Sequence, residues 1–463
     1  MQTVRVRGAH AAPTWWERHR AATRARRAWR RERRLGRRTW FGRHPKTIAS
    51  LVVFLALTPV WVSLGDSMAS ANTLPLPVQF VEWVRSHGGG GFVRWTESIW
   101  YAHHPPPKGG RPAPGAIPAP VQSTTTTAPS VPQLPPPPDI VPLASPPLPG
   151  EGQWHPIGRT VEGQPAMYAA YLRPDPVHTS LVAGVVWMDP LLLRAQLYAG
   201  AQTPGTPGNW SPMAPISATA AQTLTAAFNA GFRMNASLGG FYLDGKTAVP
   251  LRNGAASFVV YANGTATVGA WGTNVTMTPQ VVAVRQNLSL LVNNGAPVPG
   301  LNANDTTVWG ATLGNQIYVW RSGLGVTADG ALVYVGGPGL NITTLANLLV
   351  RAGAVRAMEF DINTDWVNFF SFSPPAGQAA SPANGTKLLS DMVRPVSRYF
   401  GPTNRDFITM SVRATPLRSL SSGLAPSATG SSRSATGTSG TRSGTSGTRS
   451  GGASTRSPAT RSG

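Results

Sequence analysis

The run AMEFDINTDW, residues 357–366, has the alternation of a β-strand. Its apolar and polar residues follow one another in the order Met358, Glu359, Phe360, Asp361, Ile362 and Asn363. A strand points successive side chains to opposite faces, so one face is apolar and the other carries two acids and an amide. Acids are seldom buried without a partner, so we expect the polar face to form either an ion pair with an arginine or a binding site.

Similar strand-like runs recur through residues 151–413. They are LVAGVVWM (181–188), SFVVYA (257–262), TATVGAW (265–271), VVAVRQNLSLLVN (281–293), QIYVWRSGLGVT (316–327) and ALVYVGG (331–337), bounded by Gly and Asn turns. Two stretches have helical character, residues 219–232 and 341–353, the second with Asn341 or Thr343 as its cap and Gly353 as its stop. Strands with a few inserted helices predict an α+β domain with mixed or antiparallel sheets.

The net charge of +22 is unevenly distributed along the chain. Residues 1–46 carry +13, residues 47–150 carry zero, residues 151–413 carry +3 and residues 414–463 carry +6. The folded domain is therefore nearly neutral and lies between two basic ends. A nucleic-acid partner is not expected, because membrane topology and anionic lipid explain the basic segment 1–46 more simply.

Residues 47–66 are expected to form a single transmembrane helix. The run TIASLVVFLALTPVWVSL (47–64) is uncharged and long enough for a bilayer core. The arginines before it should stay cytoplasmic, which places the N-terminus inside and the C-terminal domain outside the cell membrane. The alternatives are a buried core helix and a signal peptide cleaved after Ala71, which ends a small-x-small motif.

The segments beyond the apolar run also have distinct compositions. Residues 67–103 are expected to form two juxtamembrane amphipathic helices, which lie at the membrane face or pack on the main domain. Residues 104–150 contain 17 prolines, which predicts an extended linker. Residues 414–463 repeat Ser, Gly, Thr and Arg, which predicts a disordered tail.

The common catalytic motifs are missing from the domain. No Walker loop, GxGxxG, HExxH or GxSxG occurs, and its two histidines, His155 and His178, lie far from the polar clusters in the sequence. The chain has no cysteine, which excludes disulfides and Cys-ligated zinc. No cofactor is expected and no metal ligands are assigned, while the sequence leaves a divalent metal open. The protein's own chemistry must depend on carboxylates, arginine, asparagine and lysine.

Three polar clusters are the candidates for that chemistry. In AAFNAGF (226–232), Asn229 interrupts an apolar run and Gly231 allows close backbone approach, although a turn or cap is the alternative. In WRSGLGVTADGALVYV (320–335), Arg321 binds either a phosphate or one of the acids, and Asp329-Gly330 predicts a hairpin turn. The third cluster is the opening strand.

The order of these clusters resembles the phosphodiester glycosidase domain, the family of the lysosomal uncovering enzyme and of bacterial exopolysaccharide-associated proteins. The resemblance covers most of residues 215–375 and consists of N-A-G-F, then R-x-G-x-G-V-x-x-D-G-x-L-V-Y-V, then a helix and M-E-F-D. Where the family has L-D-G-G-G-S, this chain keeps the acid as Asp361 but replaces the glycines with Ile362 and Asn363. Arg233 stands where the family has a second aromatic residue.

The resemblance implies hydrolysis of sugar-1-phosphodiester linkages in envelope glycans. It assigns Asp361, Glu359 and Arg321 to catalysis, with Arg321 on the phosphate. It assigns Asn229, Gly231, Arg233, Asn363 and Asp365 to substrate binding. The alternative is a non-catalytic envelope protein of the same fold that binds a glycan or a protein partner, which the altered glycine loop favours. An enzyme should bring Asn229, Arg321 and Asp361 into one site, whereas a non-catalytic descendant should pair Arg321 with Asp361.

Overall fold

The computed structural model describes residues 14–36, 45–69, 76–89, 91–93, 96, 99, 105–120, 131–205, 209–305, 308–310 and 317–420. The expected disordered tail from residue 421 onward, the cleavage point after Ala71 and most of the second juxtamembrane helix lie outside these residues. The fold class is confirmed: antiparallel sheets with a few helices form the C-terminal domain, and an apolar helix precedes it.

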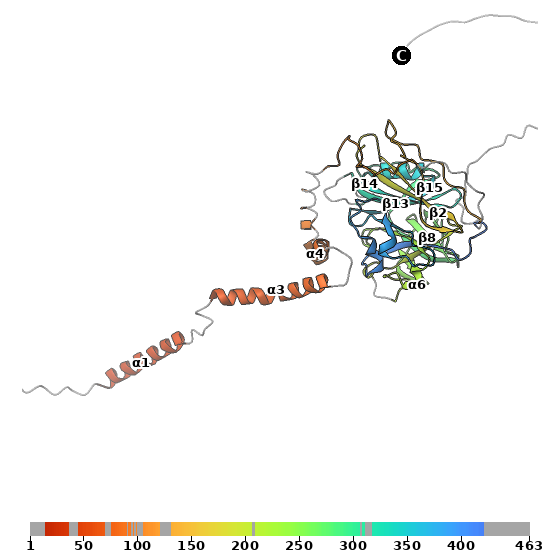
Figure 1. Ribbon diagram of the computed structural model, residues 1–463. Helices are drawn as coiled ribbons and strands as arrows, with labels where there is room; N and C mark the ends of the chain where they lie inside the picture. The colour runs from red at the N-terminus through yellow and green to blue at the C-terminus, as the bar shows by residue number, and fades with distance from the viewer. Residues whose placement is uncertain are drawn as a thin grey trace, which may run out of the picture. The chain divides into compact units, whose positions relative to one another are not determined.

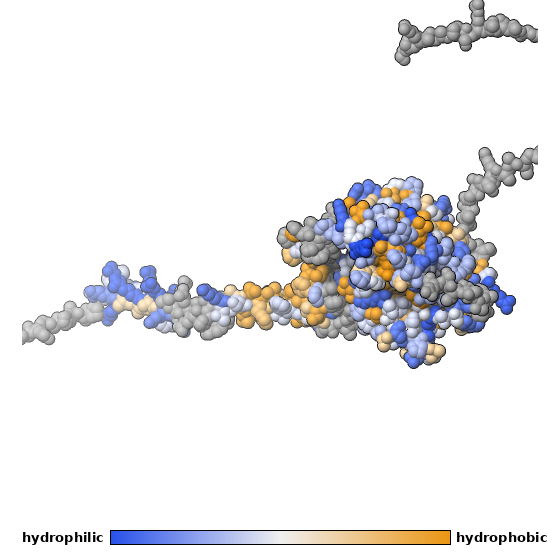
Figure 2. Space-filling view, turned by 45° about the horizontal axis from the view of Figure 1, so that its top comes forward, coloured by the Kyte–Doolittle hydropathy of each residue, from blue (hydrophilic) through white to orange (hydrophobic). Residues whose placement is uncertain are grey.

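The N-terminal region is helical. Its elements are α1 (Trp15–Gly36), α3 (Pro45–Ala69), α4 (Leu76–Val84) and the π-helical turn η1 (Arg85–Gly89). In α3, Ala49–Asp66 has a mean hydropathy of 1.6 and none of it is buried, which fits a membrane span or a signal sequence. Figure 2 shows the surface of α3 as largely hydrophobic and that of α1 as largely hydrophilic. Helix α4 lies against α3, where Trp83 Nε1 donates to Ser63 Oγ at 3.1 Å.

The largest sheet has eight strands. In spatial order they are β1 (His155–Val161), β2 (Gln164–Leu172), β3 (Ala183–Met188), β14 (Leu332–Leu340), β13 (Val319–Thr327), β15 (Ala354–Ile362), β11 (Leu290–Asn293) and β12 (Ala296–Pro297). Of these, strands β2, β13, β14 and β15 are labelled in Figure 1. Strands β13 and β14 form a hairpin around the expected turn at Asp329-Gly330, where Gly330 has a φ of +89°. Residues 357–362 of the run AMEFDINTDW form the end of β15, which lies beside β13.

Two five-stranded sheets complete the domain. The first contains β7 (Lys246–Val249), β6 (Phe241–Leu243), β10 (Val281–Gln286), β8 (Ala256–Tyr261) and β9 (Ala266–Ala270). The second contains β17 (Gly385–Lys387), β16 (Phe369–Phe372), β5 (Leu224–Asn229), β18 (Phe407–Val412) and β4 (Leu193–Tyr198). The remaining short helices are α6 (Ala218–Ala221), η3 (Pro382–Asn384) and η4 (Val396–Phe400). All pairings between these strands are antiparallel.

The large sheet is buried on both faces. One face packs against the two smaller sheets, with Met358 and Phe360 of β15 in the same core cluster as Phe228 and Phe258. The other face packs against α7 (Ile342–Arg351), the helix expected at 341–353. The Asn341 side chain caps α7 by accepting from Thr344 N at 2.8 Å, and the chain leaves the helix at Gly353 with a φ of +91°. This double burial explains the mainly apolar strands of the sheet.

The prediction of a helix over residues 219–232 is wrong for most of that range. Only Ala218–Ala221 is helical, and Leu224–Asn229 is the central strand β5. Its alanines favour a helix locally, but the segment is fully buried between β16 and β18, and Phe228 stacks on Phe369. Tertiary packing therefore overrides helix propensity here.

The proline-rich region packs on the domain wherever the structure describes it. We call residues 131–150 the proline-rich strap. Its Ile140 is 3% exposed and contacts the core beneath α7, and Leu134 N donates to the buried Asp189 at 2.8 Å. The strap ends at a buried ion pair between Glu151 and Arg173, whose Nη2 also donates to the carbonyls of Ala144 and Pro146. Within the linker expected over residues 104–150, residues 131–150 therefore pack on the domain and do not act as a free spacer.

Candidate active site

A β-bulge at the end of β15 separates the two acids of the opening run. Gly323 of β13 pairs with Glu359, and Arg321 pairs with Ile362, so one residue of β13 opposes two residues of β15. The extra residue breaks the alternation and redirects the side chain that follows. Glu359 and Asp361 therefore do not share a site, contrary to the expectation from strict alternation.

Glu359 and Arg321 form a buried ion pair with each other. Arg321 Nη1 lies 2.6 Å from Glu359 Oε1, and the two side chains are 2% and 0% exposed. Arg321 also donates from Nε to the Leu340 carbonyl at 3.1 Å. Burial raises the pKa of Glu359 to about 7, against the opposing effect of the Arg321 guanidinium. The structure thus pairs Arg321 and Glu359 with each other, and Arg321 does not pair with Asp361.

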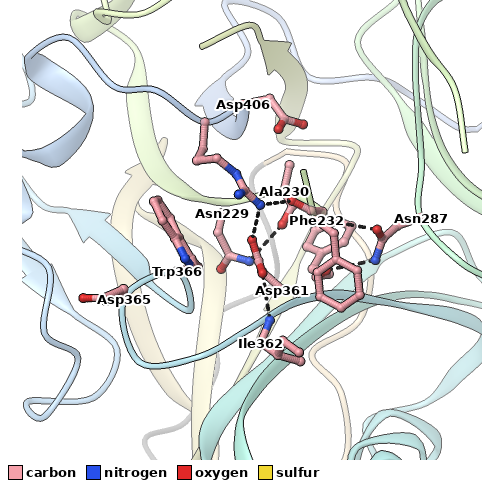
Figure 3. Close-up of polar contacts among 12 residues, drawn as sticks. Asn229, Ala230, Phe232, Asn287, Asp361, Ile362, Asp365, Trp366 and Asp406 are labelled. Carbon is pink, nitrogen blue, oxygen red and sulfur yellow. Dashed lines mark hydrogen bonds and ion pairs between the residues drawn. The ribbon is translucent and has the colours of Figure 1, made fainter. Parts of the chain in front are cut away.

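Asp361 forms a different ion pair, with Arg405. Arg405 Nη2 lies 2.8 Å from Asp361 Oδ2, and the same nitrogen donates to the Gly231 carbonyl at 3.1 Å. Asp361 Oδ1 accepts from the backbone N–H of Ile362 at 2.9 Å (Figure 3). Burial raises the pKa of Asp361 to about 7, while Arg405 and the Ile362 N–H act to lower it. Nearby Asp406 also raises this pKa.

The Asn229 side chain holds the backbone of this site, and its hydrogen-bond donors and acceptors are already used within the protein. Its Oδ1 accepts from the Tyr334 hydroxyl at 2.9 Å and from Asn368 N at 3.1 Å, and its Nδ2 donates to Ser322 Oγ at 2.9 Å. Ser322 in turn donates to the Asp361 carbonyl at 3.1 Å. Asn229 therefore fixes the backbone at Asp361. The hydroxyl-binding role expected for it does not fit a side chain that is 4% exposed with all these bonds made.

Gly231 and Arg233 lie on the segment that follows β5. A Cβ on Gly231 would lie 3.0 Å from the Asn287 side chain, so the glycine permits packing against the protein itself. Asn287 fixes this segment by accepting from Phe232 N at 3.1 Å (Figure 3). Its Nδ2 donates to the Glu359 and Phe360 carbonyls at 2.9 Å. Arg233 is half-buried close to Asp361 and Arg405, and burial together with Arg405 lowers its pKa. Arg233 is thus the expected binding residue that the structure does bring to Asp361.

The loop after Asp361 turns at Asn363. Asn363 has a φ of +87°, a conformation that glycine adopts without strain and asparagine tolerates better than most residues. Its N–H donates to the Trp320 carbonyl, and its side chain accepts from Asp365 N at 3.2 Å. Asn363 therefore adopts a turn conformation that glycine would favour, and its side chain stabilises the loop.

Sequence reasoning missed three arginines that complete the site. Arg394, Arg398 and Arg405, here called the arginine cluster, surround the Trp366 ring, with guanidinium carbons 5.3, 5.2 and 4.8 Å from its centroid. Arg394 Nε and Arg398 Nη1 both donate to the Asp365 carbonyl. The sequence offered one indication of them: the three arginines fall in a single stretch of 12 residues, although the domain as a whole has few charged residues. Only the fold brings them to β15.

Residues 222–361 match the family model described as phosphodiester glycosidase. This stretch is a phosphodiester glycosidase domain by sequence. The solved structures that are similar to the chain include the following two. One is the catalytic domain, auto-inhibited by its pro-peptide, of zebrafish N-acetylglucosamine-1-phosphodiester alpha-N-acetylglucosaminidase, at 14% identity and a TM-score of 0.34, covering 56% of this chain and 87% of that one. The other is a hypothetical protein from Synechocystis, at 14% identity and 0.28, covering 53% and 64%. No curated protein sequence matches the chain.

The matched stretch of the phosphodiester glycosidase domain contains only part of the site. Asn229, Gly231 and Arg233 lie within it, and Asp361 is its last residue. The arginine cluster lies beyond its end. The site therefore combines family-matched residues with a second group supplied by the C-terminal part of the domain.

Proposed function

We propose that this domain hydrolyses a sugar-1-phosphodiester. The observation that carries the proposal is the Asp361 carboxylate, the last residue of the family-matched stretch, held 2.8 Å from Arg405, which belongs to the arginine cluster. A pair of this kind supplies the two groups that the reaction needs, a carboxylate for the anomeric carbon and a cation for the phosphate. The phosphate-binding role expected for Arg321 passes in this proposal to Arg405.

The proposed reaction breaks the bond between C1 of the sugar and the phosphate oxygen. The electron pair of that bond leaves with the phosphomonoester. Ionised Asp361 stabilises the positive charge that develops at C1, or forms a bond to C1 that breaks when water displaces the carboxylate. Water then adds its oxygen to C1 and releases a proton to solvent. Because phosphate is a weakly basic leaving group, the reaction needs little help from a general acid. This suits a site whose described residues include no histidine.

Arg405 retains a donor for the leaving phosphate. Its Nη2 is occupied by Asp361 and Gly231, but its Nε has no hydrogen-bond partner among the described residues. A buried guanidinium N–H without a partner is costly, and a phosphate oxygen would satisfy it. Arg233, half-buried beside the pair, adds a second positive charge near the same position.

A non-catalytic glycan-binding protein is the second candidate. The Asp361–Arg405 pair is closed, with side chains only 7% and 8% exposed. Arg321 forms the ion pair with one of the acids that the sequence offered as an alternative, but its partner is Glu359 and not Asp361. A closed pair that does not open for a substrate would leave a stable fold without turnover. This candidate predicts glycan binding that survives the loss of the Asp361 charge.

We further propose an envelope location for the enzyme. Helix α3 as a single membrane span, with the basic helix α1 on the cytoplasmic side, would present the domain to sugar-phosphate linkages of envelope glycans. The charge of α1 and the exposed apolar surface of α3 support this placement.

The test is release of free sugar from a panel of sugar-1-phosphodiesters by the full chain, compared with Asp361→Asn. The control is Asp391→Asn, which removes an exposed carboxylate on the segment after β17. Release that is lost in Asp361→Asn and retained in Asp391→Asn supports the proposal. Equal release by Asp361→Asn and the wild type would rule out the mechanism, and glycan binding without release would support the second candidate.

A further inference from the structure

Arg394 lacks partners for part of its guanidinium. The residue is fully buried, and its Nε donates to the Asp365 carbonyl at 2.7 Å. Its Nη1 and Nη2 have no hydrogen-bond partner among the residues that the structure describes. Burial and the neighbouring Arg398 lower the pKa of Arg394 to about 10. Unpaired buried donors of this kind are uncommon in proteins, and at a functional site they indicate a group that binds there.

The surroundings of Arg394 carry more positive than negative charge. The described charged side chains near Asp361 and Trp366 are those of Arg233, Arg285, Arg394, Arg398, Arg405, Asp361, Asp365 and Asp406. Arg285 is neutralised by Asp406 at 2.6 Å, and Arg405 by Asp361 at 2.8 Å. Counted together, these described side chains are five arginines and three acids. Excess charge in a buried site is costly unless an opposite charge is present, so the cluster favours an anion.

Asp365 is the acidic partner of Arg394, but the contact between the two side chains is long. Its Oδ1 lies 3.4 Å from Arg394 Nη2, longer than a charge-assisted hydrogen bond, and its side chain is 27% exposed whereas Arg394 is fully buried. Asp365 is therefore the part of this ion pair that faces solvent. An incoming dianion with three oxygens would satisfy both Nη groups of Arg394, which one distant carboxylate oxygen does not.

We propose that Arg394 and Arg398, with Asp365 as a displaceable counter-ion, form a second anion subsite that binds a phosphoryl group. The subsite lies beside the Asp361–Arg405 pair, because Arg394 and Arg405 both contact the Trp366 ring. Their guanidinium carbons lie 5.3 and 4.8 Å from the centroid of that ring. If the domain has the proposed function, this subsite identifies its substrates as sugar phosphodiesters that carry a further phosphate, such as a repeating sugar-phosphate chain.

The direct test is calorimetric binding of inorganic phosphate to the full chain, which needs no turnover. We expect Arg394→Met to weaken binding by about tenfold or more, because it removes two charge-assisted hydrogen bonds. We expect Arg394→Lys, which keeps the charge but not the fork of donors, to lie between Arg394→Met and the wild type. Asp365→Asn should bind phosphate more tightly than the wild type, because the competing carboxylate is gone. An unfolded protein cannot produce that gain.

The matched control is Arg194→Met, which removes an exposed arginine from β4 and changes the net charge equally. It should bind phosphate as the wild type does. Unchanged affinity in both Arg394→Met and Asp365→Asn, or no phosphate binding by the wild type, would overturn the subsite. Equal weakening by Arg394→Met and Arg194→Met would also overturn it, since that reports net charge alone. Phosphate binding that follows these expectations while Asp361→Asn leaves sugar release unchanged would keep the subsite and reject the proposed hydrolysis.

Discussion

At the scale of single residues, the site differs from its sequence pattern because of one extra residue in β15. Strict alternation puts Glu359 and Asp361 on one face, but the bulge opposite Ser322 gives each acid its own arginine. The importance of Asp361 could be predicted from its family motif. Its partner could not, because Arg405 is 44 residues away in the sequence and pairs through the tertiary fold.

The raised pKa of Asp361 gives the proposed reaction a defined pH dependence. Asp361 must be ionised to stabilise the charge at C1, and burial raises its pKa to about 7. The value of kcat/KM should therefore be low below this pH, rise as the carboxylate loses its proton, and level off above it. Rates measured across this range with a sugar-1-phosphodiester test the prediction. A profile that falls through pH 7 would instead identify Asp361 as a general acid.

Asn363 offers a test of backbone strain in the loop. Asn363→Ala should lower the free energy of unfolding by about 1–2 kcal/mol, because alanine tolerates a positive φ poorly. Asn363→Gly should cost less than Asn363→Ala, although both variants lose the side-chain bond to Asp365 N. Urea denaturation of the two variants separates the effects. Equal losses would show that the side-chain bond, and not the backbone conformation, decides the stability.

At the scale of elements, strands were predicted better than the segments between them. The runs at 181–188, 257–262 and 331–337 all became strands because their apolar residues match the two buried faces of the sheets. Two segments were not predictable by composition. The alanines of β5 favour a helix in isolation, and the prolines of the strap favour an extended chain in solvent. In the folded protein both segments instead bury apolar side chains, because neighbouring elements provide a surface to pack against.

The proline-rich strap should contribute to stability. Ile140→Ala should lower the free energy of unfolding by about 2–5 kcal/mol, because Ile140 is 3% exposed in the core beneath α7. Its neighbour provides the control: Val141 is 70% exposed, so Val141→Ala should change stability by less than about 0.5 kcal/mol. Equal effects in thermal or urea unfolding would mean that the strap behaves as the free linker first expected. A domain for biochemical work should accordingly include the strap.

At the scale of the whole molecule, the proposed topology is open to chemical labelling. The chain has no cysteine, so a single introduced cysteine reports its own location. In intact cells a membrane-impermeant maleimide should label Ala113→Cys, between α4 and the domain, and should leave Ala21→Cys in α1 unlabelled until the cells are permeabilised. The reverse pattern would contradict the orientation. A mature protein without α3 would identify the helix as a signal sequence.

The central claim is that the bond at C1 of the sugar breaks, with Asp361 acting on that carbon. Hydrolysis of a sugar-1-phosphodiester by the full chain in water enriched in oxygen-18 tests it most directly. The label should appear in the released sugar, and the phosphomonoester should contain none, as phosphorus NMR can resolve. Label in the phosphate would mean that water attacks phosphorus, and would contradict the claim.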